Sequence, residues 1–131
     1  MPILAWKDSF LLGLPEFDDH HRHLAELLNK THDQYTVNPA GGALEAILLK
    51  LADYATYHFQ AEESWMKGHG YPHLDRHRKE HDTFTDTVAV LQNECLAGQC
   101  TSAALFFFLA EWFSTHVLES DADYARKSCS D

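Results

Sequence analysis

Residues 74–95 alternate steps of three and four between positions that carry apolar or histidine side chains. These positions are Leu74, His77, His81, Phe84, Val88, Leu91 and Cys95. Side chains at this spacing share one face of an α-helix, which repeats every 3.6 residues. The pattern predicts a helix over about residues 73–97 that buries one side against the rest of the molecule.

Three further segments repeat this alternation. They are expected at about residues 18–36, 43–67 and 101–120. Asp18 or Asp19 can cap the first helix, and Thr101 or Ser102 can cap the last. Glycine and proline residues separate the segments, because both residue types interrupt a helix.

Four amphipathic helices joined by short breaks predict an all-α protein, an up-down-up-down antiparallel four-helix bundle, since short loops make consecutive helices antiparallel neighbours. No segment shows convincing strand alternation. Residues 1–17 lack a sustained period and are expected to form an N-terminal arm, pinned across the bundle by Trp6 and Phe10. At 131 residues the chain is expected to form one domain.

Composition excludes several classes of partner. The formal net charge of -10 argues against nucleic acid or an anionic membrane surface, because both attract positive proteins. No apolar run is long enough to span a membrane, and the N-terminus lacks the features of a secretory signal, so a cytoplasmic protein is expected.

The three cysteines form no C-x-x-C pair and suit a reducing compartment better than a disulfide framework. No exposed apolar stripe remains outside the core, which predicts a monomer.

Polar side chains occupy apolar positions on three of the four helical stripes. They are His58, Glu62, His77, His81, His116 and Asp121. Burying such a group without a partner costs roughly 2 to 7 kcal/mol. Two histidines at i and i+4 have their Cβ atoms about 5 to 6 Å apart on one helix face, so both imidazoles can bind one metal ion. The set therefore predicts a metal centre inside the bundle.

Two positions of this centre stay open on spacing alone. In the first helix His20 and His21 both lie near the edges of the apolar face, and His23 lies further off. Asp121 follows His116 by five residues, which rotates it by about 140° around an ideal helix. It can approach the metals if the helix ends or bends there.

The ligand types narrow the metal chemistry without deciding it. Imidazole and carboxylate ligands together suit iron, zinc, copper or manganese. A zinc hydrolase helix of the H-E-x-x-H type is excluded because Arg78 follows His77. The Glu-x-x-His pairs of ferritin-like di-iron proteins are also missing, since no glutamate has a histidine three residues later.

The motifs "W…DSFLLGLPEFDDHHRHL", "HFQAEE", "HRKEH" and "WFSTHVLESD" cover about 120 residues in order. With these motifs the chain resembles the hemerythrin family, of the bacterial single-domain kind, which implies that residues 1–131 form one hemerythrin-like domain. It implies two non-haem iron ions bridged by hydroxide or oxide. The pattern of Asp18, His21 and Leu24 matches the family and selects His21.

The resemblance also implies a role for each ligand. His77, His81 and His116 hold one iron, while His21 and His58 hold the other, which keeps an open position. Glu62 and Asp121 bridge the two ions. The residues expected to line the pocket are Leu24, Phe84, Trp112 and Phe113.

The function implied is reversible dioxygen binding by a soluble oxygen carrier or store that is not an enzyme and can supply an oxygen-consuming enzyme. Two alternatives are an oxygen sensor or adaptor, and a di-iron peroxidase or iron store. The remaining histidines and the charged residues of "HRKEHD" are expected at the solvated surface. These histidines are His20, His23, His32, His69 and His73.

Overall fold

A computed structural model describes residues 3–38, 42–96 and 103–129 of the chain. The long helices are α1 (Pro15–Val37), α2 (Gly42–Gly68), α3 (Leu74–Leu96) and α4 (Ala103–Thr115). A π-helical turn, η2 (His116–Asp121), joins α4 to α5 (Ala122–Cys129), and a short 3₁₀ turn, η1 (Asp8–Phe10), precedes α1. The described residues contain no strand, so the predicted all-α class is confirmed.

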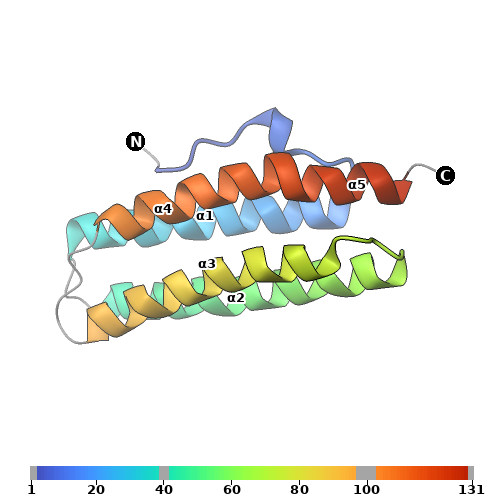
Figure 1. The fold of residues 1–131 in the computed structure, drawn as a ribbon. Helices are drawn as coiled ribbons and strands as arrows, with labels where there is room; N and C mark the ends of the chain where they lie inside the picture. The colour runs from blue at the N-terminus through green and yellow to red at the C-terminus, as the bar shows by residue number, and fades with distance from the viewer. Residues whose placement is uncertain (1–2, 39–41, 97–102, 130–131) are drawn as a thin grey trace.

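The helices form an antiparallel four-helix bundle (Figure 1). α1 packs on α2, α2 on α3, and α4 on both α3 and α1. Each interface joins apolar faces of the kind that the three- and four-residue spacing predicts. The bundle therefore has one long interior that receives side chains from all four helices.

Two apolar clusters fill this interior on either side of a polar middle. The larger one lies where α2 begins and α3 ends, and its most deeply buried side chains include Leu44, Leu48, Leu91, Phe106 and Leu109. The smaller cluster lies at the opposite end of the bundle and consists of Phe17, Met66, Tyr71, Tyr124 and Ala125. The polar middle is thereby enclosed by apolar packing along the bundle axis.

The N-terminal arm lies across the outer side of α1 and α4 (Figure 1). Phe10 is completely buried and packs edge-to-face on Phe113, with ring centroids 5.5 Å apart. Trp6 packs on Phe10 at 5.2 Å. The backbone N–H of Leu4 donates to the Asn29 side chain, which donates back to the Leu4 carbonyl. The expectation that Trp6 and Phe10 pin the arm is confirmed.

The helix ends differ from the expected ones at two places. α1 begins at Pro15, three residues early, because proline is well suited to the first helical position. Asp18 does not cap this helix but accepts hydrogen bonds from the backbone N–H groups of Leu12 and Gly13. The last helical stretch, expected to end at about residue 120, continues past Asp121 as α5, which buries Tyr124. The expected caps at residues 101–102 lie outside the described residues.

Two expectations about the surroundings of the chain have different outcomes. Among the described residues, no helix is both long and apolar enough to cross a membrane. Cys95, however, is disulfide-bonded. The preference for unpaired cysteines is therefore wrong at this position, because cysteines need no C-x-x-C spacing to form a disulfide.

Candidate metal centre

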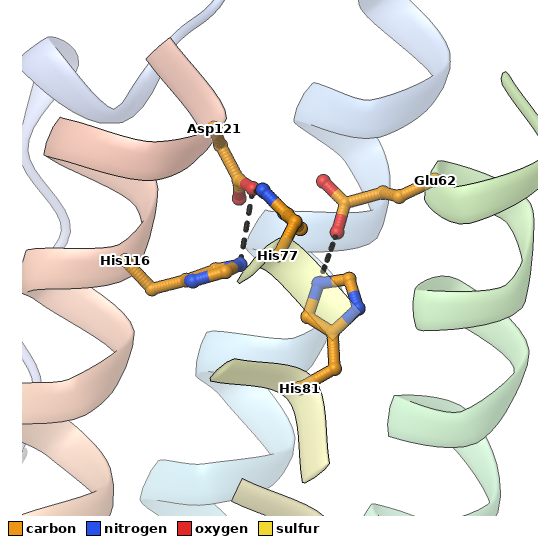
Figure 2. A group of neighbouring side chains, drawn as sticks. All are labelled: Glu62, His77, His81, His116 and Asp121. Atoms are coloured by element: carbon orange, nitrogen blue, oxygen red, sulfur yellow. Dashed lines mark ion pairs between the residues drawn. The ribbon is translucent and has the colours of Figure 1, made fainter. Parts of the chain in front are cut away.

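The seven residues predicted as ligands meet in the polar middle of the bundle. All of them are buried, with at most 3 % of each residue exposed. α1 contributes one of them, α2 and α3 two each, and η2 the last two. The residues are His21, His58, Glu62, His77, His81, His116 and Asp121. Figure 2 shows five of them pointing toward one another from three sides.

The π-helical turn explains how Asp121 reaches the site. In η2 the N–H of Ala122 bonds to the carbonyl of Val117, five residues back. This widened turn brings residue i+5 over residue i, whereas an α-helix would rotate it away. His116 and Asp121, the first and last residues of η2, therefore share one face.

Three histidines surround one side of the centre. His77 Nε2 lies 2.8 Å from Asp121 Oδ1, and His116 Nε2 lies 3.1 Å from the same oxygen. His81 Nε2 lies 3.2 Å from Glu62 Oε1. These five residues can offer ligand atoms that all lie within 4.8 Å of one another. We call them the three-histidine group.

Two histidines form the second side. His58 Nε2 lies 3.1 Å from Glu62 Oε1, and His21 Nε2 lies 3.4 Å from Glu62 Oε2. His21 Nε2 is also 3.0 Å from Asp121 Oδ2. We call His21, His58 and Glu62 the two-histidine group, following the second set of ligand atoms within 4.8 Å. Both carboxylates thus face both sides, as bridging ligands must.

Many of the inward-facing atoms are buried without a hydrogen-bond partner in the described structure. They are His21 Nε2, His77 Nε2, His81 Nε2, His116 Nε2, Glu62 Oε1 and both carboxylate oxygens of Asp121. Leaving such an atom unsatisfied costs about 1 to 3 kcal/mol. Imidazole nitrogens and carboxylate oxygens are ligands that iron, zinc and manganese accept. The residues therefore fit a pair of metal ions, although their role as ligands stays a prediction.

Without metal, charge accumulates in the centre as ion pairs. Burial lowers the pKa of His21, but the close carboxylates of Asp121 and Glu62, 3.0 and 3.4 Å from its Nε2, outweigh burial and raise the pKa to about 9. Burial also lowers the pKa of His116, and the charge of Asp121 raises it to about 10. Burial raises the pKa of each carboxyl group, whereas the histidines hold both pKa values well below the ordinary range. Protons thus occupy nitrogen sites that a metal cation would replace.

Two glutamates that the sequence analysis missed orient ligand histidines from outside. Glu63 Oε2 lies 2.8 Å from His81 Nδ1, and Glu80 Oε1 lies 2.8 Å from His116 Nδ1. The hydrogen bond from His116 lowers the pKa of Glu80 to about 2. Such a carboxylate keeps the proton on Nδ1 and leaves Nε2 free for a metal. Glu80 remains partly solvated, as expected, with 32 % of its side chain exposed, but its bond to His116 was not predicted.

His20 is also closer to the centre than expected. It is 7 % exposed, and its Nδ1 lies 2.9 Å from Nδ1 of His58. The surface position predicted for His20 is therefore wrong. His21, one residue further along α1, faces the carboxylates instead. A helical wheel could not separate the two because both lie at the edge of the apolar face.

Aromatic and aliphatic side chains surround the ligands. The three expected lining residues Leu24, Phe84 and Phe113 are at most 2 % exposed. Trp112, the fourth, stacks on His116 with centroids 4.3 Å apart and an interplanar angle of 13°. Phe59, which the sequence analysis missed, stacks on His81 at 4.0 Å and 11°. The position of Phe59 next to His58 gave no signal, because it lies off the stripe of ligands.

Buried imidazoles and shared carboxylates in a four-helix bundle define a class of helical proteins with paired metal sites. A family model, the hemerythrin HHE cation-binding domain, matches residues 12–127. The chain belongs to the hemerythrin family.

Relatives in this family resemble the chain over most of its length. It is 31 % identical to a bacteriohemerythrin of Stenotrophomonas maltophilia over 125 residues, which are 95 % of this chain and 81 % of the relative. It is 30 % identical to bacteriohemerythrins of Clostridium acetobutylicum and Methylococcus capsulatus, with 93 % and 95 % of this chain and 98 % and 95 % of the relatives covered.

Solved structures agree with the fold. The crystal structures of an alanine and a tyrosine point mutant of a hemerythrin superpose with TM-scores of 0.86 and 0.87 at 26 % identity. They cover 96 % and 98 % of this chain and 97 % and 98 % of the compared chains. Family membership and the cluster of histidines and carboxylates together support a non-haem iron protein that binds oxygen.

Proposed function

We propose that the chain holds two non-haem iron ions, bridged by hydroxide or oxide, and binds dioxygen reversibly as a carrier or store. The observation that carries this proposal is the set of buried ligand atoms that have no hydrogen-bond partner and converge from four helical segments. His77, His81 and His116 would hold one ion, His21 and His58 the other, and Glu62 and Asp121 both. The printed names of the relatives and the family model support the assignment.

An iron pair held here would supply electrons to dioxygen on binding and take them back on release. The chain's own residues determine where this happens. Three histidines face one position and two face the other, so the two-histidine position has one histidine ligand fewer. A position that lacks a protein ligand is open to a small molecule.

The surroundings of the centre keep water out and hold the ligands in place. Leu24 and Phe113 are buried, and the Phe113 ring lies 6.1 Å from the ring of His21. Tyr124 donates a hydrogen bond of 2.7 Å to Glu62 Oε2 and thereby fixes this carboxylate. A dry, apolar pocket favours release of dioxygen over further reduction, because solvent and proton access tune the reactivity of a metal site.

A cycling experiment tests the proposal. The protein is loaded with ferrous iron without oxygen, exposed to air and then flushed with argon, while its visible spectrum is recorded. We expect two irons per chain and a charge-transfer band that appears with air and disappears with argon over repeated cycles. One-way oxidation with peroxide turnover would instead indicate a peroxidase, and uptake of many irons per chain would indicate an iron store.

We further propose that the protein acts as a cytoplasmic monomer that supplies an oxygen-consuming enzyme and is not itself an enzyme. The large exposed apolar side chains support a monomer because they are spread over several elements, for example Val37 of α1, Leu49 of α2 and Val90 of α3. Sedimentation of the iron-loaded protein tests the oligomeric state. If the protein binds a partner only when oxygen is bound, and this binding does not change the partner's oxygen supply, the sensor or adaptor role is favoured.

A further inference from the structure

The outer partners of the ligand histidines differ between the two sides of the centre. In the three-histidine group, Nδ1 of His81 and Nδ1 of His116 each face a carboxylate oxygen at 2.8 Å. In the two-histidine group, Nδ1 of His58 faces the imidazole of His20. His21 Nδ1 is buried and has no hydrogen-bond partner among the described residues. Neither histidine of the two-histidine group is backed by a carboxylate through Nδ1.

Both carboxylates are themselves held by a second donor. Arg78 Nε donates to Glu63 Oε1 at 3.1 Å, and Ser120 Oγ donates to Glu80 Oε1 at 2.5 Å. Their side chains remain 23 % and 32 % exposed, so solvent stabilises the two charges. The two glutamates are therefore fixed, ionised acceptors at the surface of the bundle.

His20 can only be a neutral acceptor when His58 binds a metal. A metal on His58 Nε2, the nitrogen 3.1 Å from Glu62, requires the proton of His58 to be on Nδ1. That N–H then donates to Nδ1 of His20, which must be unprotonated. The rings of Phe17, Tyr54 and Tyr57 surround His20 at 5.7, 6.0 and 5.3 Å. The acceptor at this position is thus an uncharged imidazole in an aromatic setting.

A charged acceptor makes an imidazole a stronger metal ligand than a neutral one does. A hydrogen bond to a carboxylate is roughly twice as strong as one between neutral groups. It also raises the basicity of the other ring nitrogen, and loss of such an outer partner typically costs 10–100-fold in metal affinity. The hydrogen-bond partners of the ligand histidines therefore add to the difference in metal affinity that three histidines at one position and two at the other already create.

We propose that the two metal positions are unequal in donor strength because Glu63 and Glu80 strengthen the three-histidine position while His20 leaves the two-histidine position weaker. This inference rests on the proposed function, since it takes the seven residues as ligands. The weakly donating position is the one with the missing protein ligand. Its ion is consequently the first to be lost.

Titration of the metal-free protein with Co²⁺ tests this, with visible absorption and calorimetry as readouts. We expect two resolved binding steps in the unmodified protein. His58→Gln should remove the weak step and keep the tight one, which identifies the two positions. Glu63→Gln and Glu80→Gln should each weaken the tight step by about 10–100-fold and change the weak step by less than about twofold.

A matched pair at His20 tests the other half of the proposal. His20→Gln keeps a neutral acceptor for His58 and should leave the weak step within about twofold of the unmodified protein. His20→Glu provides a carboxylate and should strengthen the weak step by about 10-fold. Glu119→Gln, the loss of an exposed acidic residue beside Ser120, is the control for net charge and should change neither step.

The outcomes separate this inference from the proposed function. If the unmodified protein binds no Co²⁺, the metal centre itself is refuted, and the inference with it. If two ions bind but Glu63→Gln and Glu80→Gln weaken both steps equally, or neither, the metal centre stands and the assigned inequality is wrong. If His20→Glu does not fold, the two glutamine variants of Glu63 and Glu80 still decide the question.

Discussion

Two regions of the bundle interior have the same helical spacing but opposite effects on stability. At the end that we call the leucine end, the inward positions are Leu44, Leu48, Leu91, Phe106 and Leu109, and burial alone stabilises each side chain by about 1.5 to 3 kcal/mol. In the polar middle, which we call the histidine region, equivalent positions hold the seven proposed ligands. Burying these destabilises the bundle unless protons or metal ions satisfy them. The leucine end can therefore hold the fold together while the histidine region depends on what it binds.

The largest expected effect is the loss of Glu62, which belongs to both ligand groups. Glu62→Ala should remove both iron ions, because neither position keeps its bridging carboxylate. The free energy of unfolding should fall by about 3 to 5 kcal/mol, since buried, protonated histidines lose their counter-charge. Iron analysis and denaturant unfolding measure the two effects.

Two companion variants make this test specific. His77→Ala should remove the ion of the three-histidine group and leave a weakened second site. Gln60→Ala, an exposed change half a turn from Glu62 on α2, should retain both ions. Unchanged iron content in Glu62→Ala and His77→Ala would refute the ligand assignment.

A cavity at the leucine end should destabilise the protein without removing iron. Leu48 is 1 % exposed, and Leu48→Ala should destabilise the protein by about 2 to 5 kcal/mol through lost packing. The iron content should stay at that of the unmodified protein. Leu49, its neighbour on the outer side of α2, is 56 % exposed, and Leu49→Ala should cost less than about 0.5 kcal/mol. Loss of iron from Leu48→Ala would show that metal binding in the histidine region depends on packing at the leucine end.

The helices and most of the site could be predicted because both follow from one spacing rule. An alternation of three- and four-residue steps places His58 one helical turn before Glu62 and His77 one turn before His81, whatever the details of packing. The stripe of the last long helix follows the same rule up to Thr115, where α4 ends, and His116 is the next residue. Asp121 could not be placed this way, because the π-helical hydrogen bonding of η2 is absent from any α-helical periodicity.

The outer layer could not be predicted for a different reason. Glu63 and Glu80 lie beside the ligand stripes, where charged residues ordinarily face solvent. Only the packing of α2 on α3 and of α3 against η2 brings them to His81 and His116. His20 is a similar case, since its partner His58 belongs to another helix. Such contacts depend on tertiary structure that sequence spacing does not encode.

Raising the pH should destabilise the metal-free protein through its histidine region and leave the stability of the metal-loaded protein unchanged. The pKa values of His21 and His116 are raised to about 9 and about 10, above the ordinary value of 6.5. Their contribution to stability is therefore complete below about pH 6.5 and is lost as the pH rises through these values. Thermal unfolding of the metal-free protein should show a loss on the order of a few kcal/mol between about pH 7 and pH 10. With Zn²⁺ bound in place of the protons, this loss should disappear, and equal losses in both forms would contradict the assignment.

The smallest expected effect concerns Tyr124, at the border between the histidine region and the smaller apolar cluster. Its hydroxyl donates to Glu62 Oε2, so Tyr124→Phe removes one donor from a buried carboxylate and should cost about 1.5 kcal/mol. Both iron ions should remain, while the charge-transfer band shifts because Glu62 becomes a stronger donor. Tyr71→Phe removes the same atom from a hydrogen bond to Asp123, outside the ligand set, and should leave the band in place. If the two variants shift the band equally, the hydroxyl of Tyr124 supports packing in general and does not tune the metal centre.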